Sequence, residues 1–114
     1  MIAYHVTERS RLSSILREGL VPRLGQVAGE IYSVKGIWLS KYPEHMFGWE
    51  DFEDPVILEV DVPTSYVQYE DEAGMEVYPE AEPFYVRRRV SSGRVRLLGS
   101  LELFLKSKQK HNLP

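Results

Sequence analysis

Few residue types in this chain could do chemistry. It has three histidines, His5, His45 and His111, and no cysteine, so thiolate nucleophiles, thiolate metal ligands and disulfides are excluded. His5 lies in a short apolar run, directly before a stretch with helical spacing. Carboxylates gather in residues 70–82, where one of them could stabilise positive charge that develops during a reaction.

Several common sites are absent from the sequence. It contains no GxxxxGK[ST] phosphate loop, no GxSxG turn and no HExxH motif, and its histidines are too dispersed to indicate a metal site. The acidic run at 50–54 lacks the glycine and ligand spacing of an EF-hand, which favours a solvated loop. We therefore expect no metal site.

Length and composition predict one globular domain. The 114 residues are enough for one core, and 43% hydrophobic with 27% charged residues argues against a disordered chain. A net charge of −3 gives no general attraction to nucleic acid. No signal-peptide pattern begins the sequence, and no apolar run approaches the roughly 20 residues that span a bilayer. We expect a cytoplasmic protein without a membrane segment.

Two short helices and several short strands are predicted. Thr7 is a predicted N-cap for a helix that stops at Gly19, and Pro43 favours a second helix at 43–51. Residues 21–35 have little periodicity and predict an irregular loop. Strands are predicted at 2–6, 36–40 and 54–63, and as an antiparallel hairpin at 83–90 and 93–100.

The order of these elements predicts the fold class. Helices come early and strands cluster late, which favours an α+β fold, mostly antiparallel, over a doubly wound sheet. A single domain is expected at 1–105, followed by a basic tail at 106–114.

Four pieces of the sequence together resemble a known family. They are YHVT on the first strand, LSSILREGLVPR in the helix, GIWLS on the second strand and PVILEVDVP on the third. Their order is similar to that of the ADP-ribosyltransferase fold in its small, diphtheria-toxin-like members. These include rifampicin ADP-ribosyltransferases, DNA-targeting toxins and RNA 2′-phosphotransferases. The resemblance covers about half of the chain and implies a compact α+β enzyme that uses NAD as a substrate.

The resemblance implies roles for residues on the first two strands. His5 and Thr7 would hold the adenosine ribose of NAD, the ring of Trp38 would flank the nicotinamide, and the hydroxyl of Ser40 would support the site. Further aromatic candidates for the nicotinamide pocket are Tyr32 and Tyr42. The residues alone leave other interpretations open: His5 as a hydrogen-bonded core histidine, Thr7 as a helix cap only, and Trp38 as core packing.

Glu82 is the predicted catalytic carboxylate. Cleavage of the nicotinamide glycosidic bond passes through an oxocarbenium-like cation that a nearby carboxylate stabilises. The family carries an acidic residue at the start of a late strand, often just before an aromatic residue, and Glu82 stands in that place. A surface role for Glu82 is the alternative, and the rival glutamates are Glu70, Glu72, Glu76 and Glu80.

The sequence departs from the family at Val6, where glycine is common after the histidine. The paired arginines and histidine of the RNA 2′-phosphotransferases are also absent, which makes that activity less expected.

Arginines concentrate on the predicted hairpin. We expect a positive strip that could bind the NAD pyrophosphate, a nucleic acid or an acidic partner, and the alternative is protection of an edge strand by charge. Its members are Arg87, Arg89, Arg94 and Arg96.

Two functions follow from this pattern. The first is an NAD-dependent mono-ADP-ribosyltransferase that modifies a protein, a nucleic acid or a small molecule. The second is a non-catalytic module of the same fold that binds a nucleotide or a partner. A small toxin or phage effector is compatible with either, and the sequence does not name the acceptor.

Overall fold

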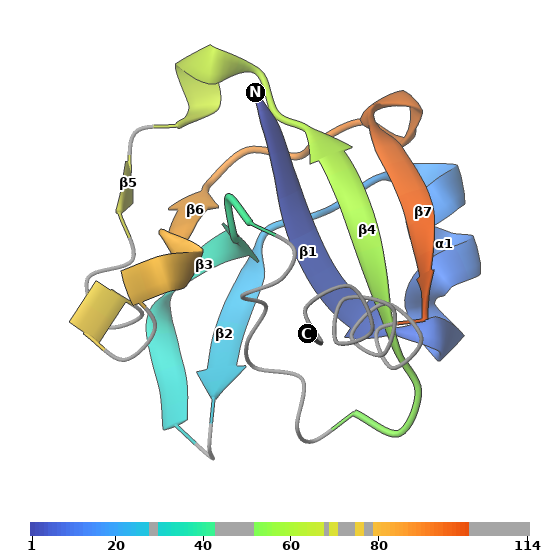
Figure 1. Cartoon of the computed structure of the whole chain (residues 1–114), viewed down its shortest axis with the longest axis horizontal. Coiled ribbons are helices and arrows are strands. Elements are labelled where there is room, and N and C mark those ends of the chain that lie inside the picture. The colour runs from blue at the N-terminus through green and yellow to red at the C-terminus, as the bar shows by residue number, and fades with distance from the viewer. Residues whose placement is uncertain (28–29, 43–51, 68, 71–74, 77–78, 101–114) are drawn as a thin grey trace, which may run out of the picture.

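The computed structural model describes residues 1–27, 30–42, 52–67, 69–70, 75–76 and 79–100, and it contains two antiparallel sheets (Figure 1). The three-stranded sheet has the order β1-β4-β7, and the four-stranded sheet has the order β2-β3-β6-β5. The strands are β1 (Ile2–Glu8), β2 (Arg23–Val27), β3 (Glu30–Leu39), β4 (Pro55–Asp61), β5 (Tyr69–Glu70), β6 (Phe84–Val86) and β7 (Val95–Ser100). The expected α+β class with antiparallel strands is confirmed.

One α-helix has described bounds in the structure. The α-helix with described bounds is α1 (Leu12–Glu18), and the second predicted helix, at 43–51, lies outside the described residues, as does the basic tail at 106–114. Short 3-10 turns occur at η1 (Arg9–Arg11), η3 (Thr64–Tyr66), η4 (Pro79–Ala81) and η5 (Ser92–Arg94). Within the described ranges, no helix has the length and apolar character needed to cross a membrane.

Apolar side chains from both sheets form one buried cluster. Its members on β3, β4 and β6 are Ile37, Leu39, Leu58, Val60, Phe84 and Val86. Burying a side chain of this size contributes about 1.5–3 kcal/mol. Because successive side chains on a strand point to opposite faces, Trp38 and Tyr85 lie on the faces of β3 and β6 away from this cluster.

The end of α1 follows the sequence prediction. Gly19 has a φ of 86°, which a side-chain-bearing residue rarely adopts, and a Cβ there would lie 2.2 Å from the Val90 carbonyl oxygen. Leu20, the next residue, is buried in the core cluster. It exchanges two backbone hydrogen bonds with Val90, of 2.9 and 3.0 Å, and so ties the residues after α1 to the segment before β7.

Two predictions about the first 35 residues are wrong. Thr7 does not cap a helix, because β1 continues through it, pairs Thr7 with Val56 and buries it. The N-cap of α1 is Arg11. Residues 21–35 are not an irregular loop, because β2 pairs with β3 and a register shift between Leu24 and Gln26 accommodates Gly25.

The predicted hairpin at 83–90 and 93–100 is also wrong. Strand β6 pairs with β3 and β5, whereas β7 pairs with β4 in the other sheet. The segment between them carries the chain from one sheet to the other, held at Val90 by its bridge to Leu20. Partners distant in sequence thus replace the local turn.

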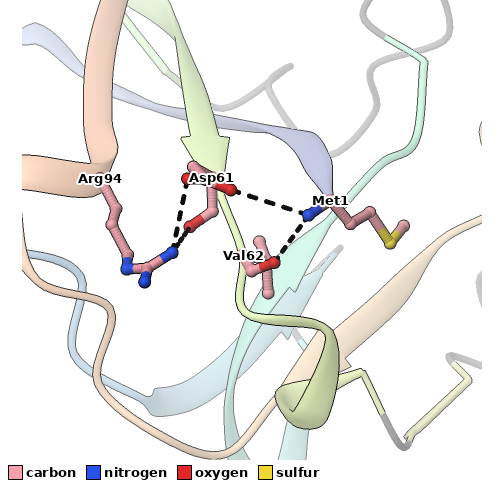
Figure 2. A network of polar contacts seen from close by, with 4 residues as sticks. All are labelled: Met1, Asp61, Val62 and Arg94. Atoms are coloured by element: carbon pink, nitrogen blue, oxygen red, sulfur yellow. Dashed lines mark hydrogen bonds and ion pairs between the residues drawn. The ribbon is translucent and has the colours of Figure 1, made fainter.

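Polar groups of four residues tie β1, β4 and the segment before β7 together in what we call the surface network: Met1, Asp61, Val62 and Arg94 (Figure 2). The Met1 amine donates to the Val62 carbonyl at 2.9 Å and lies 3.7 Å from the Asp61 carboxylate. The Arg94 guanidinium lies 3.4 Å from the same carboxylate. The Asp61 side chain is 55% exposed, so these charges are well solvated.

Candidate functional site

The two sheets meet where β1 touches the end of β3. Tyr4 and Ser40 exchange backbone hydrogen bonds of 2.8 and 2.9 Å. In a continued antiparallel ladder, the next such pair would be Val6 and Trp38. Instead, the Trp38 carbonyl oxygen lies 2.8 Å from Nδ1 of His5, so an imidazole takes the place of a backbone amide as the strands separate.

This hydrogen bond determines which nitrogen of His5 carries the proton. A carbonyl oxygen only accepts, so Nδ1 donates and Nε2 of the neutral ring keeps its lone pair. Burial lowers the pKa of His5, the Trp38 carbonyl opposes this effect, and the charge of Arg11 adds to it. His5 is therefore a neutral ring whose Nε2 can accept a hydrogen bond.

Thr7 lies beside His5 in the way that alternation requires. Because β1 stays regular through Glu8, residues two apart share a face, and His5 and Thr7 face the same side. Val6 lies on the opposite face, buried, and pairs with Ile57.

Trp38 forms an aromatic pair with Tyr85. The two residues are opposite each other in the ladder between β3 and β6, and their rings stack with centroids 5.4 Å apart and planes at 26°. Gly36 leaves room for the pair, since a Cβ there would lie 2.9 Å from the Tyr85 ring and 3.4 Å from the Trp38 ring. Tyr32 is on the same strand, and its side chain lies outside what the structure describes.

Ser40 ties the end of β3 to the turn η4. Ser40 is 1% exposed, and its hydroxyl shares its proton between the carbonyl oxygens of Tyr42, at 2.8 Å, and Ala81, at 3.0 Å. The hydroxyl oxygen accepts from the Tyr42 amide at 3.2 Å, and the Lys41 amide donates to Ala81 at 3.0 Å. We call His5, Trp38, Ser40, Tyr42 and Ala81 the junction network.

Glu82 is the residue directly after Ala81 of the junction network. Its φ of 44° is the one positive value for a non-glycine residue in the described part of the chain. The side chain is 44% exposed, with the Lys41 Nζ 3.5 Å from the carboxylate. A hydrogen bond from the Tyr42 hydroxyl lowers the pKa of Glu82, partial desolvation raises it, and Lys41 lowers it further. Glu82 is an ionised carboxylate within reach of solvent.

The structure links predicted site residues through two hydrogen bonds. Nδ1 of His5 bonds to the Trp38 carbonyl, and the hydroxyl of Ser40, the residue after β3, bonds to the carbonyl of the residue before Glu82. Thr7 is the next residue after His5 on the same face of β1. The side chain of Tyr32 lies outside the described part of the structure.

The rival glutamates have different surroundings. Glu76 and Glu80 are exposed, the side chain of Glu70 is outside the described part, and Glu72 is outside it altogether. Of the described carboxylates in this stretch, Glu82 is the one joined to the residues after β3.

The hairpin that would place Arg87 and Arg89 opposite Arg94 and Arg96 is not formed. Because there is no hairpin, Arg94 faces Asp61, Arg96 lies 3.0 Å from Glu59 of β4, and Arg89 donates to the Glu18 carbonyl at the end of α1. These three guanidinium groups are engaged within the chain, as β7 lies beside the acidic residues of β4.

Sequence reasoning missed how Lys41, Tyr42 and Tyr85 take part. Tyr42 was a candidate as an aromatic ring only, whereas its hydroxyl bonds to Glu82. The sequence signal for Lys41 and Tyr42 is that they directly follow Ser40. The signal for Tyr85 is that it lies on a predicted strand and can pair with Trp38. Neither signal identifies the partner, since Ser40 and Ala81 are 41 positions apart.

Comparison with known proteins adds no relative to this picture. The sequence matches no protein-family model, and neither the curated proteins nor the solved structures give a match.

Proposed function

We propose that this chain is a mono-ADP-ribosyltransferase that transfers ADP-ribose from NAD to an acceptor, which is a protein, a nucleic acid or a small molecule. The observation that carries the proposal is a pair of hydrogen bonds where the two sheets meet: His5 bonds to the Trp38 carbonyl, and Ser40 bonds to the carbonyl of Ala81, the residue before Glu82. The resemblance of the sequence to small ADP-ribosyltransferases implies a site that includes His5, Trp38, Ser40 and Glu82. We expect the reaction to take place in the cytoplasm.

The chemistry requires a carboxylate close to a developing cation. The bond between ribose C1′ and the nicotinamide nitrogen breaks, and its electron pair neutralises the pyridinium ring. Positive charge develops on the ribose until the acceptor nucleophile bonds to C1′ and releases its proton. Glu82 suits this step because its lowered pKa keeps it ionised at neutral pH, so it stabilises the cation without a proton transfer.

Residues on β1 and β3 suit NAD as the substrate. The Nε2 lone pair of His5 can accept a ribose hydroxyl, and the Thr7 hydroxyl shares the face of β1 with it. The ring of Trp38, already stacked on Tyr85, offers a planar surface to a nicotinamide. The side chain of Val6, which departs from the family pattern, points to the other face of β1.

Calorimetric titration with NAD, with free nicotinamide measured in the same samples, tests the proposal. Glu82→Gln should retain the fold and lower nicotinamide release by about 100-fold or more, because the charge on the cation loses its partner. Glu80→Gln is the matched control two residues away, and it should release nicotinamide at the wild-type rate.

The outcomes separate the two candidate functions. Binding without release by the wild-type chain would favour the non-catalytic nucleotide-binding module. If NAD does not bind, the alternative interpretation of His5 as a hydrogen-bonded core histidine is favoured. Equal release by wild type and Glu82→Gln would remove Glu82 from the catalytic role.

A further inference from the structure

We propose that Ser40, Lys41 and Tyr42 form a positioning unit for Glu82, which holds its carboxylate in place for cleavage of NAD. This inference rests on the proposed function and deepens it. None of the three residues needs to touch the nicotinamide ribose, because each acts through the backbone or the carboxylate of the Glu82 segment.

The first part of the unit is the buried hydroxyl of Ser40. It is the point where two chain segments join, since it bonds to both backbone groups of Tyr42 and to the carbonyl of Ala81. Removing it would leave the Tyr42 amide without this acceptor and the Ala81 carbonyl with the Lys41 amide as its remaining donor. Buried groups that lose a partner move to find another, so the Glu82 segment would shift.

The second part holds the carboxylate itself. Lys41 and Tyr42 follow the end of β3, where strand alternation no longer applies, and both side chains reach Glu82. One supplies a charge and the other a hydroxyl donor. Restraint from two directions limits rotation of a side chain that is otherwise 44% exposed.

The third part is the backbone at Glu82. Its positive φ is unfavourable for a residue with a side chain and persists only when surrounding contacts impose it. Here the Glu82 amide donates to Pro79 at 3.2 Å, Ala81 accepts two donors, and Pro83 and Phe84 are buried behind it. The strain serves to direct the carboxylate toward the residues that follow β3.

The unit should also affect pH dependence. In the described part of the chain, Tyr42 and Lys41 are the groups that lower the pKa of Glu82, and Glu80 on the same turn is exposed. Loss of either partner should raise the Glu82 pKa toward its ordinary value. The acid limb of activity would then move to higher pH.

An NMR titration of the Glu82 carboxyl group tests the positioning without any reaction. We expect its pKa to rise in Tyr42→Phe and in Lys41→Met, to remain low in Lys41→Arg, and to be unchanged in Glu80→Gln. A Glu82 pKa that is the same in wild type, Tyr42→Phe and Lys41→Met would overturn the inference.

Nicotinamide release as a function of pH tests the catalytic part. Tyr42→Phe should shift the acid limb of kcat upward in step with the titration, with little change in KM for NAD. Ser40→Ala should lower kcat by about 10- to 100-fold, because small displacements of a reacting group are costly. A Tyr42→Phe profile identical to wild type would contradict the inference even if Ser40→Ala fails to fold.

The two experiments distinguish the inference from the proposed function. If the wild-type chain releases no nicotinamide, the proposed function fails, and the role in NAD cleavage fails with it. The titration then still decides whether Lys41 and Tyr42 hold the carboxylate. If nicotinamide is released but the Tyr42→Phe and Lys41→Met variants change neither the Glu82 pKa nor the pH profile of release, the positioning inference alone fails.

Discussion

Two polar networks connect the strands of this protein, and they differ in their exposure to water. The surface network joins solvated charges, with the Asp61 side chain 55% exposed and that of Arg94 44% exposed (Figure 2). The junction network is centred on the hydroxyl of Ser40, a residue that is 1% exposed, and uses backbone carbonyl groups as its acceptors.

The difference teaches where a hydrogen bond constrains a structure. A solvated ion pair exchanges protein partners for water at little cost, so it contributes a median of about 0–1 kcal/mol. A buried hydroxyl has no water to replace its partner, and breaking its bonds costs about 1–3 kcal/mol for each group left unpaired. We therefore expect the junction network to restrain the site and the surface network to be dispensable.

Ser40→Ala should give the largest loss of stability. The Tyr42 amide loses an acceptor inside the protein, so the free energy of unfolding should fall by about 1–3 kcal/mol. Urea unfolding followed by tryptophan fluorescence measures the change. A loss no greater than that of Asp61→Asn would remove the distinction between the two networks.

His5 should make stability depend on pH. Its folded pKa lies below 6.5, the ordinary histidine value, so the unfolded chain binds the proton more readily. The stabilisation from keeping His5 neutral is complete above pH 6.5 and is lost as the pH falls toward the folded pKa. Over that range the free energy of unfolding falls by at most about 1.4 kcal/mol per pH unit.

The comparison with His5→Asn isolates this effect, since the variant keeps a donor near the Trp38 carbonyl and does not titrate. Unfolding free energies measured from pH 7.5 to pH 5 should decline more steeply for wild type. Parallel curves would show that His5 is not held neutral in the fold.

Glu82→Gly should separate stability from activity. Glycine removes the strain of the positive φ, so the thermal midpoint should stay the same or rise while nicotinamide release is lost. Glu80→Gly, in the same turn but without a positive φ, should lower the midpoint and preserve release. A lower midpoint for the Glu82 variant would show that the conformation carries no strain.

Asp61→Asn should have the smallest effect. It removes the charge that faces Arg94 and the Met1 amine, both of which remain solvated. The unfolding free energy should change by about 0.5 kcal/mol or less, and the change should shrink further in high salt. A larger loss of unfolding free energy that persists in 1 M salt would show that the surface network stabilises the fold as much as the junction network does.

Local pattern predicted part of the fold. The apolar run around His5 and the alternation from Val56 to Val62 lie on strands, and the spacing before Gly19 lies on a helix. The hairpin prediction failed where a local turn competed with distant partners. The arginine-rich segments at 83–90 and 93–100 resemble a hairpin, yet β6 pairs with β3 and β7 pairs with β4.

The sequence by itself determined the residue types of the site and the elements that carry them. His5, Trp38 and Ser40 were placed on two strands, and Glu82 was placed before a third. Tertiary structure alone decided that Trp38 bonds to His5, that Ser40 reaches Ala81 and that Lys41 and Tyr42 hold Glu82. The physical reason is that strand and helix patterns arise from near neighbours, whereas these bonds join residues at least 33 positions apart and form only when sheets pack.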